Sequence, residues 1–157
     1  MTSLHLRFIM GGILWALALL SAPSPALANG LQEAQKAYAA GDFLKAYGLY
    51  EPLALAGDPQ AQNNLGVMIL KGQGVSRNSR VAAGWFGKAA EQGLADGQYH
   101  LGLMFGWGKG VAKSRLKAAL WFQKAAAQGH AAAMDALKEM SILNTGTPLC
   151  KGTPCPF

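Results

Sequence analysis

The sequence predicts an all-α protein, specifically an α/α superhelical solenoid of antiparallel helix pairs. Residues 57–92, shifted by 36 positions, align without a gap on residues 93–128 with 16 identities. Within each copy, apolar residues recur at helical spacing, and glycine-rich turns separate the periodic segments. A single helix pair of this size cannot bury its apolar stripe alone. Successive pairs must therefore stack on one another.

Each copy contains two predicted helices joined by a Gly-x-Gly-Val turn. The first helix of copy one covers residues 58–70, with Asp58 as its N-cap and Pro59 in the first helical position. The second helix follows an N-cap at Asn78, and Ser114 takes the same position in copy two. Four aromatic residues repeat in the second helices, and we expect them to pack in the core, with partial exposure in a groove as the alternative: Trp85, Phe86, Trp121 and Phe122.

Two glycines lie inside predicted helices, at Gly66 and at the equivalent Gly102. Each costs roughly 1 kcal/mol of helix stability relative to alanine. This cost is explained if a facing helix comes so close that a methyl group would clash. We therefore expect a tight helix contact at both positions.

The first residues of the chain have the pattern of a secretory signal peptide. An uninterrupted run of 13 apolar or glycine residues follows Arg7, and small residues at Ala26 and Ala28 form an A-x-A cleavage pattern. The run is shorter than the roughly 20 apolar residues that a membrane-spanning helix needs. We expect cleavage between Ala28 and Asn29, no membrane span in the mature chain, and a periplasmic or secreted location.

The whole chain divides into six predicted segments. They are a signal peptide (1–28), an entry helix pair (29–56), repeat 1 (57–92), repeat 2 (93–129), a capping helix (130–143) and an irregular tail (144–157). The tail contains Cys150 and Cys155, whose spacing is not that of a redox or haem-binding motif. Because we expect an oxidising compartment, we expect these two residues to form a disulfide.

The repeat resembles the Sel1-like repeat family, which is related to the tetratricopeptide repeats. The resemblance rests on motifs present in both copies: Leu65-Gly66, Gly72-x-Gly74-Val75 and Trp85-Phe86-x-Lys88-Ala89-Ala90, with their counterparts 36 residues later. The sequence departs from the family pattern at two positions, because the loop Asp is replaced by Asn78 and Ser114 and the Tyr by Ile69 and Phe105. The resemblance implies a scaffold for protein–protein interaction rather than an enzyme.

The residues that carry chemistry in enzymes form no recognisable motif here. The sequence contains no H-E-x-x-H, no phosphate-binding G-x-x-x-x-G-K-[ST] and no G-x-S-x-G. His100 and His130 are far apart and have no neighbouring cysteine or acidic cluster. We therefore expect no catalytic residue, no metal site and no cofactor, and we expect both histidines to be hydrogen-bonded or exposed.

Charge and one tryptophan indicate a candidate partner-binding surface in the loops. Trp107 occupies the position that the preceding repeat gives to Lys71, so we expect it on a loop, as a binding anchor or folded back on a neighbouring helix. Both loops and the helix starts after them are basic and contain no acid among residues 71–80 and 109–117. The candidate basic residues are Lys71, Arg77, Arg80, Lys109, Lys113, Arg115 and Lys117. Their similar repeat phase predicts a basic strip along one edge, for an acidic partner or simply for solvation.

These observations favour an exported, non-catalytic scaffold that binds another protein with an acidic surface in the bacterial cell envelope. Nucleic acid is a poor partner for an exported protein. The alternative is a protein that binds or hydrolyses a peptidoglycan-type envelope polymer. Such an enzyme would need acids, His or Ser that converge outside the repeat positions, and nearly all polar groups here have structural roles in the repeat.

Overall fold

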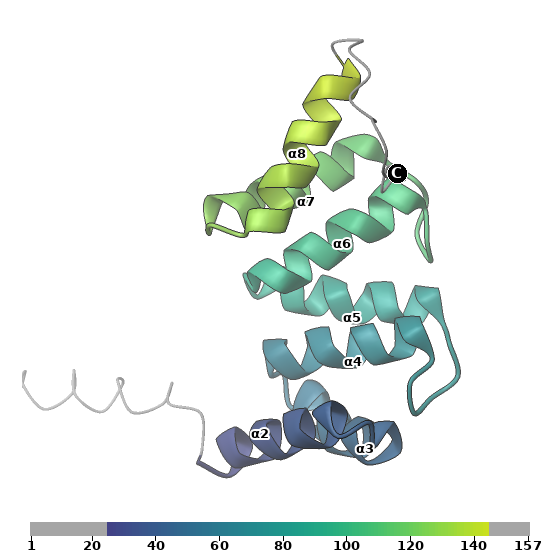
Figure 1. Cartoon of the computed structure of the whole chain (residues 1–157), viewed down its shortest axis with the longest axis vertical. Helices are drawn as coiled ribbons and strands as arrows, with labels where there is room; N and C mark the ends of the chain where they lie inside the picture. Colours follow the sequence, from purple (N-terminus) through teal and green to yellow (C-terminus); the bar gives the residue numbers. More distant parts are fainter. Residues whose placement is uncertain (1–24, 145–157) are drawn as a thin grey trace, which may run out of the picture.

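The computed structural model describes residues 25–144, and over this range it contains seven α-helices and no strand (Figure 1). This confirms the predicted all-α fold class. The first of these helices begins at Pro25, upstream of the entry pair predicted from residue 29. The helices are α2 (Pro25–Ala39), α3 (Phe43–Leu55), α4 (Pro59–Lys71), α5 (Ser79–Glu91), α6 (Ala95–Trp107), α7 (Arg115–Ala127) and α8 (Ala131–Asn144).

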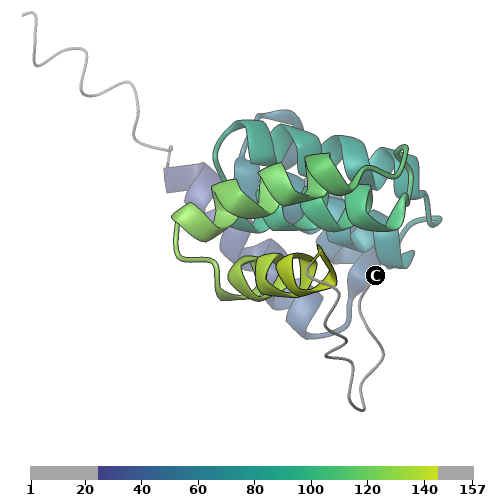
Figure 2. The same ribbon diagram turned by 90° about the horizontal axis from the view of Figure 1, so that it is seen from above.

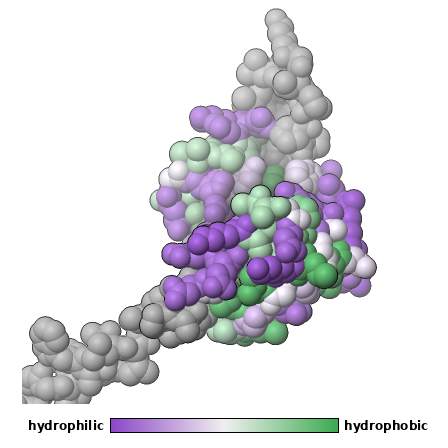
Figure 3. All heavy atoms as spheres, turned by 60° about the horizontal axis from the view of Figure 1, so that its bottom comes forward, coloured by the Kyte–Doolittle hydropathy of each residue, from purple (hydrophilic) through white to green (hydrophobic). Residues whose placement is uncertain are grey.

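The helices form one stack in chain order, from α2 and α3 at one end to α8 at the other (Figure 1). Each helix packs against the next one along the chain, and α4 also touches α6. Seen from the α8 end, α8 lies beside α7 (Figure 2). When the α2–α3 end is tilted toward the viewer, hydrophilic and hydrophobic residues lie side by side on the surface (Figure 3). The contacts between helices that follow one another in the chain hold the stack together, as in other solenoids.

The predicted helix caps are present. Asp58 Oδ1 accepts a hydrogen bond from the backbone N–H of Ala61 at 2.7 Å. Asn78 Oδ1 accepts from the N–H of Arg80 at 3.1 Å and from that of the next residue, and Ser114 Oγ accepts from the N–H of Lys117 at 3.3 Å. Asparagine and serine thus satisfy free helix N–H groups as the predicted caps should.

The tight contact expected at the two helix glycines is confirmed, and its partner is an aromatic ring. A Cβ added to Gly66 would lie 2.7 Å from Phe86 Cε1, and one added to Gly102 would lie 2.6 Å from Phe122 Cε1. Both phenylalanine side chains are fully buried. The second helix of each repeat therefore places its ring directly on the backbone of the first.

A hydrogen-bonded pair of glutamines, one buried and one exposed, recurs in each repeat, and the sequence analysis did not identify it. Gln62 Nε2 donates to the carbonyl oxygen of Ala54 at 3.1 Å, and Gln92 Nε2 donates to Gln62 Oε1 at 2.8 Å. The same pair recurs at Gln98 and Gln128, again at 2.8 Å. Gln62 and Gln98 are almost completely buried, so these bonds satisfy polar groups that would otherwise lose water without compensation. Each pair links three consecutive helices.

The Phe–Gly contact predicts opposite effects for two glycine-to-alanine substitutions. Gly102→Ala should destabilise the protein by about 1–3 kcal/mol, because the new methyl group collides with Phe122. Gly84→Ala is the matched control: Gly84 is also inside a helix, but no atom lies within 4 Å of an added Cβ. Helix propensity should therefore raise stability by about 1 kcal/mol. Urea unfolding followed by circular dichroism measures both changes, and two stabilising substitutions would contradict the close contact.

Candidate functional site

The two glycine-rich loops rest on the starts of the preceding second helices. A Cβ on Gly74 would collide with the carbonyl group of Phe43 at the start of α3. One on Gly110 would collide with the carbonyl group of Ser79 at the start of α5. Both glycines also have positive φ angles, 72° and 73°. Glycine is required at these positions both because a Cβ would collide and because the backbone angle φ is positive. The contacts bring both loops to one edge of the stack.

This edge carries the seven predicted basic residues, and we call it the loop edge. All seven are exposed. They belong to the helix end before each loop, to the loop itself and to the first turn of the helix after it: Lys71, Arg77, Arg80, Lys109, Lys113, Arg115 and Lys117. The structure thus brings the candidate residues to one edge.

Trp107 lies at a different place from the one predicted. It is the last residue of α6 rather than a loop residue, and its side chain is half-buried. The helix extends to Trp107 because Gly108 adopts a left-handed conformation (φ 71°) and donates its N–H to the carbonyl of Met104, which closes the helix after the tryptophan. The ammonium group of Lys109 lies 4.5 Å from the centroid of the indole ring. The anchor candidate is therefore fixed on a helix end beside a cation.

Besides Lys109, two further basic residues of the loop edge have intramolecular contacts. Arg115 Nη2 donates to the carbonyl oxygen of Met140 at 2.5 Å and so joins the start of α7 to α8. Lys117 Nζ lies 5.3 Å from the ring centroid of Phe105. By contrast, the charged ends of Lys71, Arg77, Arg80 and Lys113 make no hydrogen bond or ion pair with another described residue. These four side chains are the best placed for a partner.

A polar and aromatic cluster joins α4, α6 and the start of α8, and the sequence analysis did not predict it. His100 Nδ1 lies 2.8 Å from Asn63 Oδ1, and His130 Nε2 lies 3.2 Å from Asp96 Oδ1. The ring of Tyr99 stacks on that of His130 at 4.7 Å. Both histidines are hydrogen-bonded, which agrees with the prediction made for them.

His130 also starts the last helix. The backbone N–H of Ala133 donates to His130 Nδ1 at 3.2 Å, so this nitrogen carries no proton. The proton of the neutral ring is then on Nε2, where it faces Asp96. A histidine thus replaces the Ser, Thr, Asp or Asn that usually caps a helix.

Burial lowers the pKa of His100 below its usual value of 6.5. The nearby carboxylate of Asp96 opposes this shift of the pKa, while the electrostatic effects of His130 and Lys71 add to it. The ring also stacks on buried Phe86 at 4.8 Å. These surroundings favour neutral His100. Among residues 25–144, no group of three or more His, Cys, Asp or Glu side chains could hold a metal ion.

The two repeated tryptophans differ from the phenylalanines beside them. Phe86 and Phe122 are completely buried, whereas Trp85 and Trp121 are half-buried and pack on the core from outside. The ammonium groups of lysines three residues later lie over the indole rings, Lys88 at 4.0 Å and Lys124 at 4.1 Å. Each tryptophan therefore packs on the core, as predicted, with only part of its ring, and the rest of the ring is accessible.

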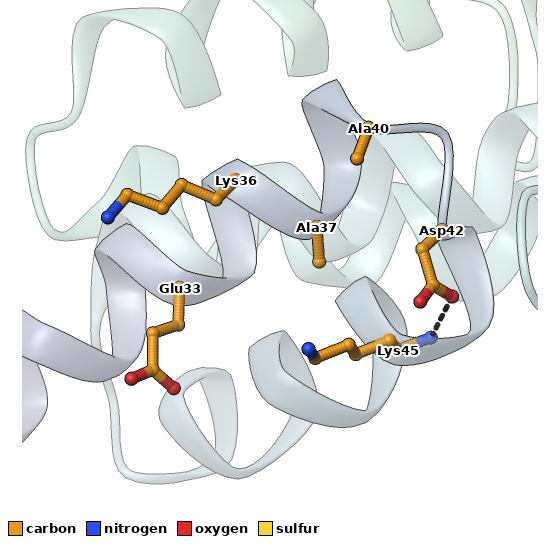
Figure 4. Close-up of a pocket in the computed structure, with 6 residues that line it drawn as sticks. All are labelled: Glu33, Lys36, Ala37, Ala40, Asp42 and Lys45. Atoms are coloured by element: carbon orange, nitrogen blue, oxygen red, sulfur yellow. Dashed lines mark hydrogen bonds between the residues drawn. The ribbon is translucent and has the colours of Figure 1, made fainter.

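Two cavities lie near the start of the stack. The larger, about 480 Å³, lies between α2 and α3 and is lined by Glu33, Lys36, Ala37, Ala40, Asp42 and Lys45. Its two acids and two bases do not converge, because Glu33 and Asp42 lie at opposite ends (Figure 4). Asp42 Oδ1 already accepts the backbone N–H of Lys45 as the cap of α3. The smaller cavity, about 90 Å³, is lined by Tyr38, Tyr50, Asn64 and Val67.

Two of the sequence predictions concern residues at the ends of the chain. Cys150 and Cys155 lie outside the described residues. The predicted cleavage point between Ala28 and Asn29 lies within α2, and the residues before Pro25 are also outside the described range.

Comparison with known families identifies the repeat. Residues 59–94 and 95–130 each match the Sel1 repeat. The chain is a Sel1 repeat protein. The two matched segments contain the α4–α5 and α6–α7 pairs, and Sel1 repeat proteins are generally non-catalytic scaffolds for protein interaction. No curated protein matches the sequence at a significant level.

Solved structures of Sel1 repeat proteins are similar to this one. A Sel1 repeat protein from Oxalobacter formigenes has a TM-score of 0.69 and 33% identity, over 73% of this chain and 47% of its own. The antigen c5321 of uropathogenic Escherichia coli, which has the same repeat fold, has a TM-score of 0.63 and 39% identity, over 64% of this chain and 22% of its own. The cysteine-rich protein B of Helicobacter pylori shares the fold at 23% identity, with a TM-score of 0.58, over 74% of this chain and 98% of its own. The chain thus spans less than half of the first two proteins.

No helix within residues 25–144 is long and apolar enough to cross a membrane.

The lowered pKa of His100 predicts that stability falls in mild acid. Above pH 6.5 the residue is neutral in both the folded and the unfolded chain. Below pH 6.5 the unfolded chain takes up a proton that folded His100 resists, so stability decreases as the pH falls toward the folded pKa. His100→Asn should remove this part of the loss. Asparagine suits the site because Asn64 has the same position in the preceding repeat.

Urea unfolding at several pH values between about 5 and 8 measures this effect. His130→Asn serves as the control, since it removes the other histidine of the cluster. An unchanged pH dependence in His100→Asn would contradict the lowered pKa.

Proposed function

We propose that this protein is an exported, non-catalytic scaffold of the cell envelope that binds a partner protein with an acidic surface through the loop edge. The observation that carries the proposal is the stacking of the two loops on the starts of α3 and α5. It places exposed basic side chains from two repeats on one edge, without an acid among residues 71–80 or 109–117. An array of this kind attracts and orients an anionic partner.

The energetics of the helix starts support a role in binding. Arg80, Arg115 and Lys117 lie in the first turns of α5 and α7, where positive charge opposes the helix dipole. Each such residue costs a few tenths of a kcal/mol of helix stability. Arg115 is partly compensated by its bond to α8, but Arg80 has no such contact among the described residues. Folding stability alone therefore does not explain the basic edge.

Trp107 supplies an apolar contact beside these charges. It is half-buried, and Lys109 lies over its ring. The preceding repeat has exposed Lys71 at the same position, so the solenoid itself does not require an aromatic residue there. Tryptophan and arginine are enriched among residues that dominate protein interfaces. Trp107 and the loop-edge charges together suit a partner with an apolar residue flanked by acids.

Binding to this edge is tested with a partner captured from the native envelope by the purified chain. Trp107→Ala should weaken binding by about 2 kcal/mol, a typical cost for an aromatic hot spot. Arg77→Glu combined with Lys113→Glu should act mainly through a slower association rate and an altered salt dependence, because neither side chain has an intramolecular partner among the described residues.

The matched control is Lys36→Glu with Lys45→Glu, which reverses the same amount of charge between α2 and α3. Surface plasmon resonance at two salt concentrations measures rates and affinity, and a thermal melt reports folding. A Trp107→Ala protein that melts several degrees lower yet binds normally would show that Trp107 belongs to the core.

Export is tested separately. When the chain is produced in a bacterium with an intact secretion pathway, the protein outside the cytoplasm should begin at Asn29, as measured by intact mass. Ala28→Arg should block this cleavage, because signal peptidase sites require small residues. Extracytoplasmic protein that retains residues 1–28 would contradict the proposed processing.

A further inference from the structure

The second helices α5 and α7 carry a solvent-exposed face that the packing of the solenoid does not explain. On each helix it is formed by residues at positions i, i+3, i+4 and i+7, which lie on one side of a helix. We call it the Trp–Lys face. It comprises Val81, Gly84, Trp85 and Lys88 on α5, and Lys117, Leu120, Trp121 and Lys124 on α7, with Leu116 beside them.

Large apolar side chains are exposed on this face. Leu116 is 72% exposed, Leu120 50% and Val81 45%. Single exposed aliphatic residues are common on protein surfaces. Here, however, they accompany the half-buried indole rings of Trp85 and Trp121 at repeat-equivalent positions. The tryptophans thus recur along the stack, while the exposed aliphatic residues beside them stand at different positions on the two helices.

Each indole ring is paired with an exposed lysine. The ammonium groups of Lys88 and Lys124 lie 4.0 and 4.1 Å from the centroids of Trp85 and Trp121. Tryptophan has an apolar body and a polar N–H, and lysine can lay its stem along apolar surface while its charge stays in water. This combination is suited to a boundary between water and lipid.

The charge of the two helices has one dominant sign. α5 and α7 together contain five basic residues and one acid, Glu91 at the end of α5. α7 contains no acid at all. Basic residues beside exposed leucines and half-buried tryptophans are typical of helices that bind membrane surfaces.

We propose that the Trp–Lys face binds the surface of an anionic phospholipid bilayer. The basic residues would contact the phosphate groups, and the leucines and indole rings would enter the boundary of the acyl chains. A bilayer fits this face better than an acidic protein does. Gly84 stands where the next repeat has Leu120, and no atom lies within 4 Å of a Cβ at that position. The face therefore has open space at Gly84 where α7 has a leucine, and lipid accepts protruding groups without a matching pocket.

The experiment measures whether Trp85 and Trp121 contact lipid in the whole chain. Trp15 and Trp107 are replaced by Phe, which leaves the two tryptophans of the face as the fluorophores. Vesicles contain acyl chains brominated to quench nearby indoles, and they consist either of phosphatidylcholine alone or of phosphatidylcholine with phosphatidylglycerol. The readout is the quenching of these two indoles, and the difference in quenching between the two kinds of vesicle reports the Trp–Lys face.

We expect quenching by the anionic vesicles and little by the zwitterionic ones. Lys88→Glu with Lys124→Glu should weaken binding to anionic vesicles by about 30-fold or more, since each basic residue near such a surface contributes on the order of 1 kcal/mol. Leu116→Ser with Leu120→Ser should weaken it by at least about tenfold. Lys36→Glu with Lys45→Glu, which changes net charge equally but lies between α2 and α3, should bind as the parent does. Circular dichroism must show equal helix content in all variants.

Three results would overturn the proposal: no quenching by anionic vesicles, equal quenching by both kinds, or an equal loss in the Lys36 and Lys45 variant. The first result, together with loss of a captured partner in the Lys88 and Lys124 variant, would assign the face to a protein instead. Lys117 belongs to both surfaces, but the test separates them, because Trp107 is replaced in every variant and all seven basic residues of the loop edge are kept.

Discussion

The contact between a phenylalanine ring and a glycine backbone determines how the two helices of each repeat fit together. Phe86 on Gly66 and Phe122 on Gly102 are so close that no side chain could stand at the glycine. The ring is fully buried because the facing helix is near enough to cover it, and the helix can come so near only because it has no Cβ at that point. The same approach brings the second helix within reach of Gln62 and Gln98, whose amide groups then find partners on both neighbouring helices. Packing and polar satisfaction thus depend on one short distance.

The repeat made much of this fold predictable. An offset of 36 residues with matching Gly, Phe and cap positions specifies paired helices that must stack, and the structure has them. The caps at Asp58, Asn78 and Ser114 were predictable because capping is local: the oxygen and the N–H that it binds are at most three residues apart. Trp107 was misplaced because the end of α6 is decided by Gly108, and a glycine on either side of the tryptophan gave two possible ends.

The polar cluster was not predictable for a different reason. Asn63 and His100 are 37 residues apart, and Asp96 and His130 are 34 apart, so only the stacked structure brings them together. Neither pair is repeated in the other copy, so the periodicity did not reveal them. The glutamine pairs could have been found, because Gln62 and Gln92 recur at the repeat offset as Gln98 and Gln128. Because glutamine is usually exposed, its recurrence was not interpreted as a buried contact.

The way the loops are anchored leaves part of each loop unconstrained. Gly74 and Gly110 rest on main-chain atoms, Val75 and Val111 pack on the core, and the caps Asn78 and Ser114 hold the next helix. Between valine and cap, residues 76–77 and 112–113 are exposed. Their backbone is fixed from both sides, yet their side chains hold nothing in place. Sequence change at these positions can therefore alter what the edge recognises at little cost to the fold, and each further repeat would add another such pair to the row. The solenoid separates the residues that keep its shape from those that are free to diverge.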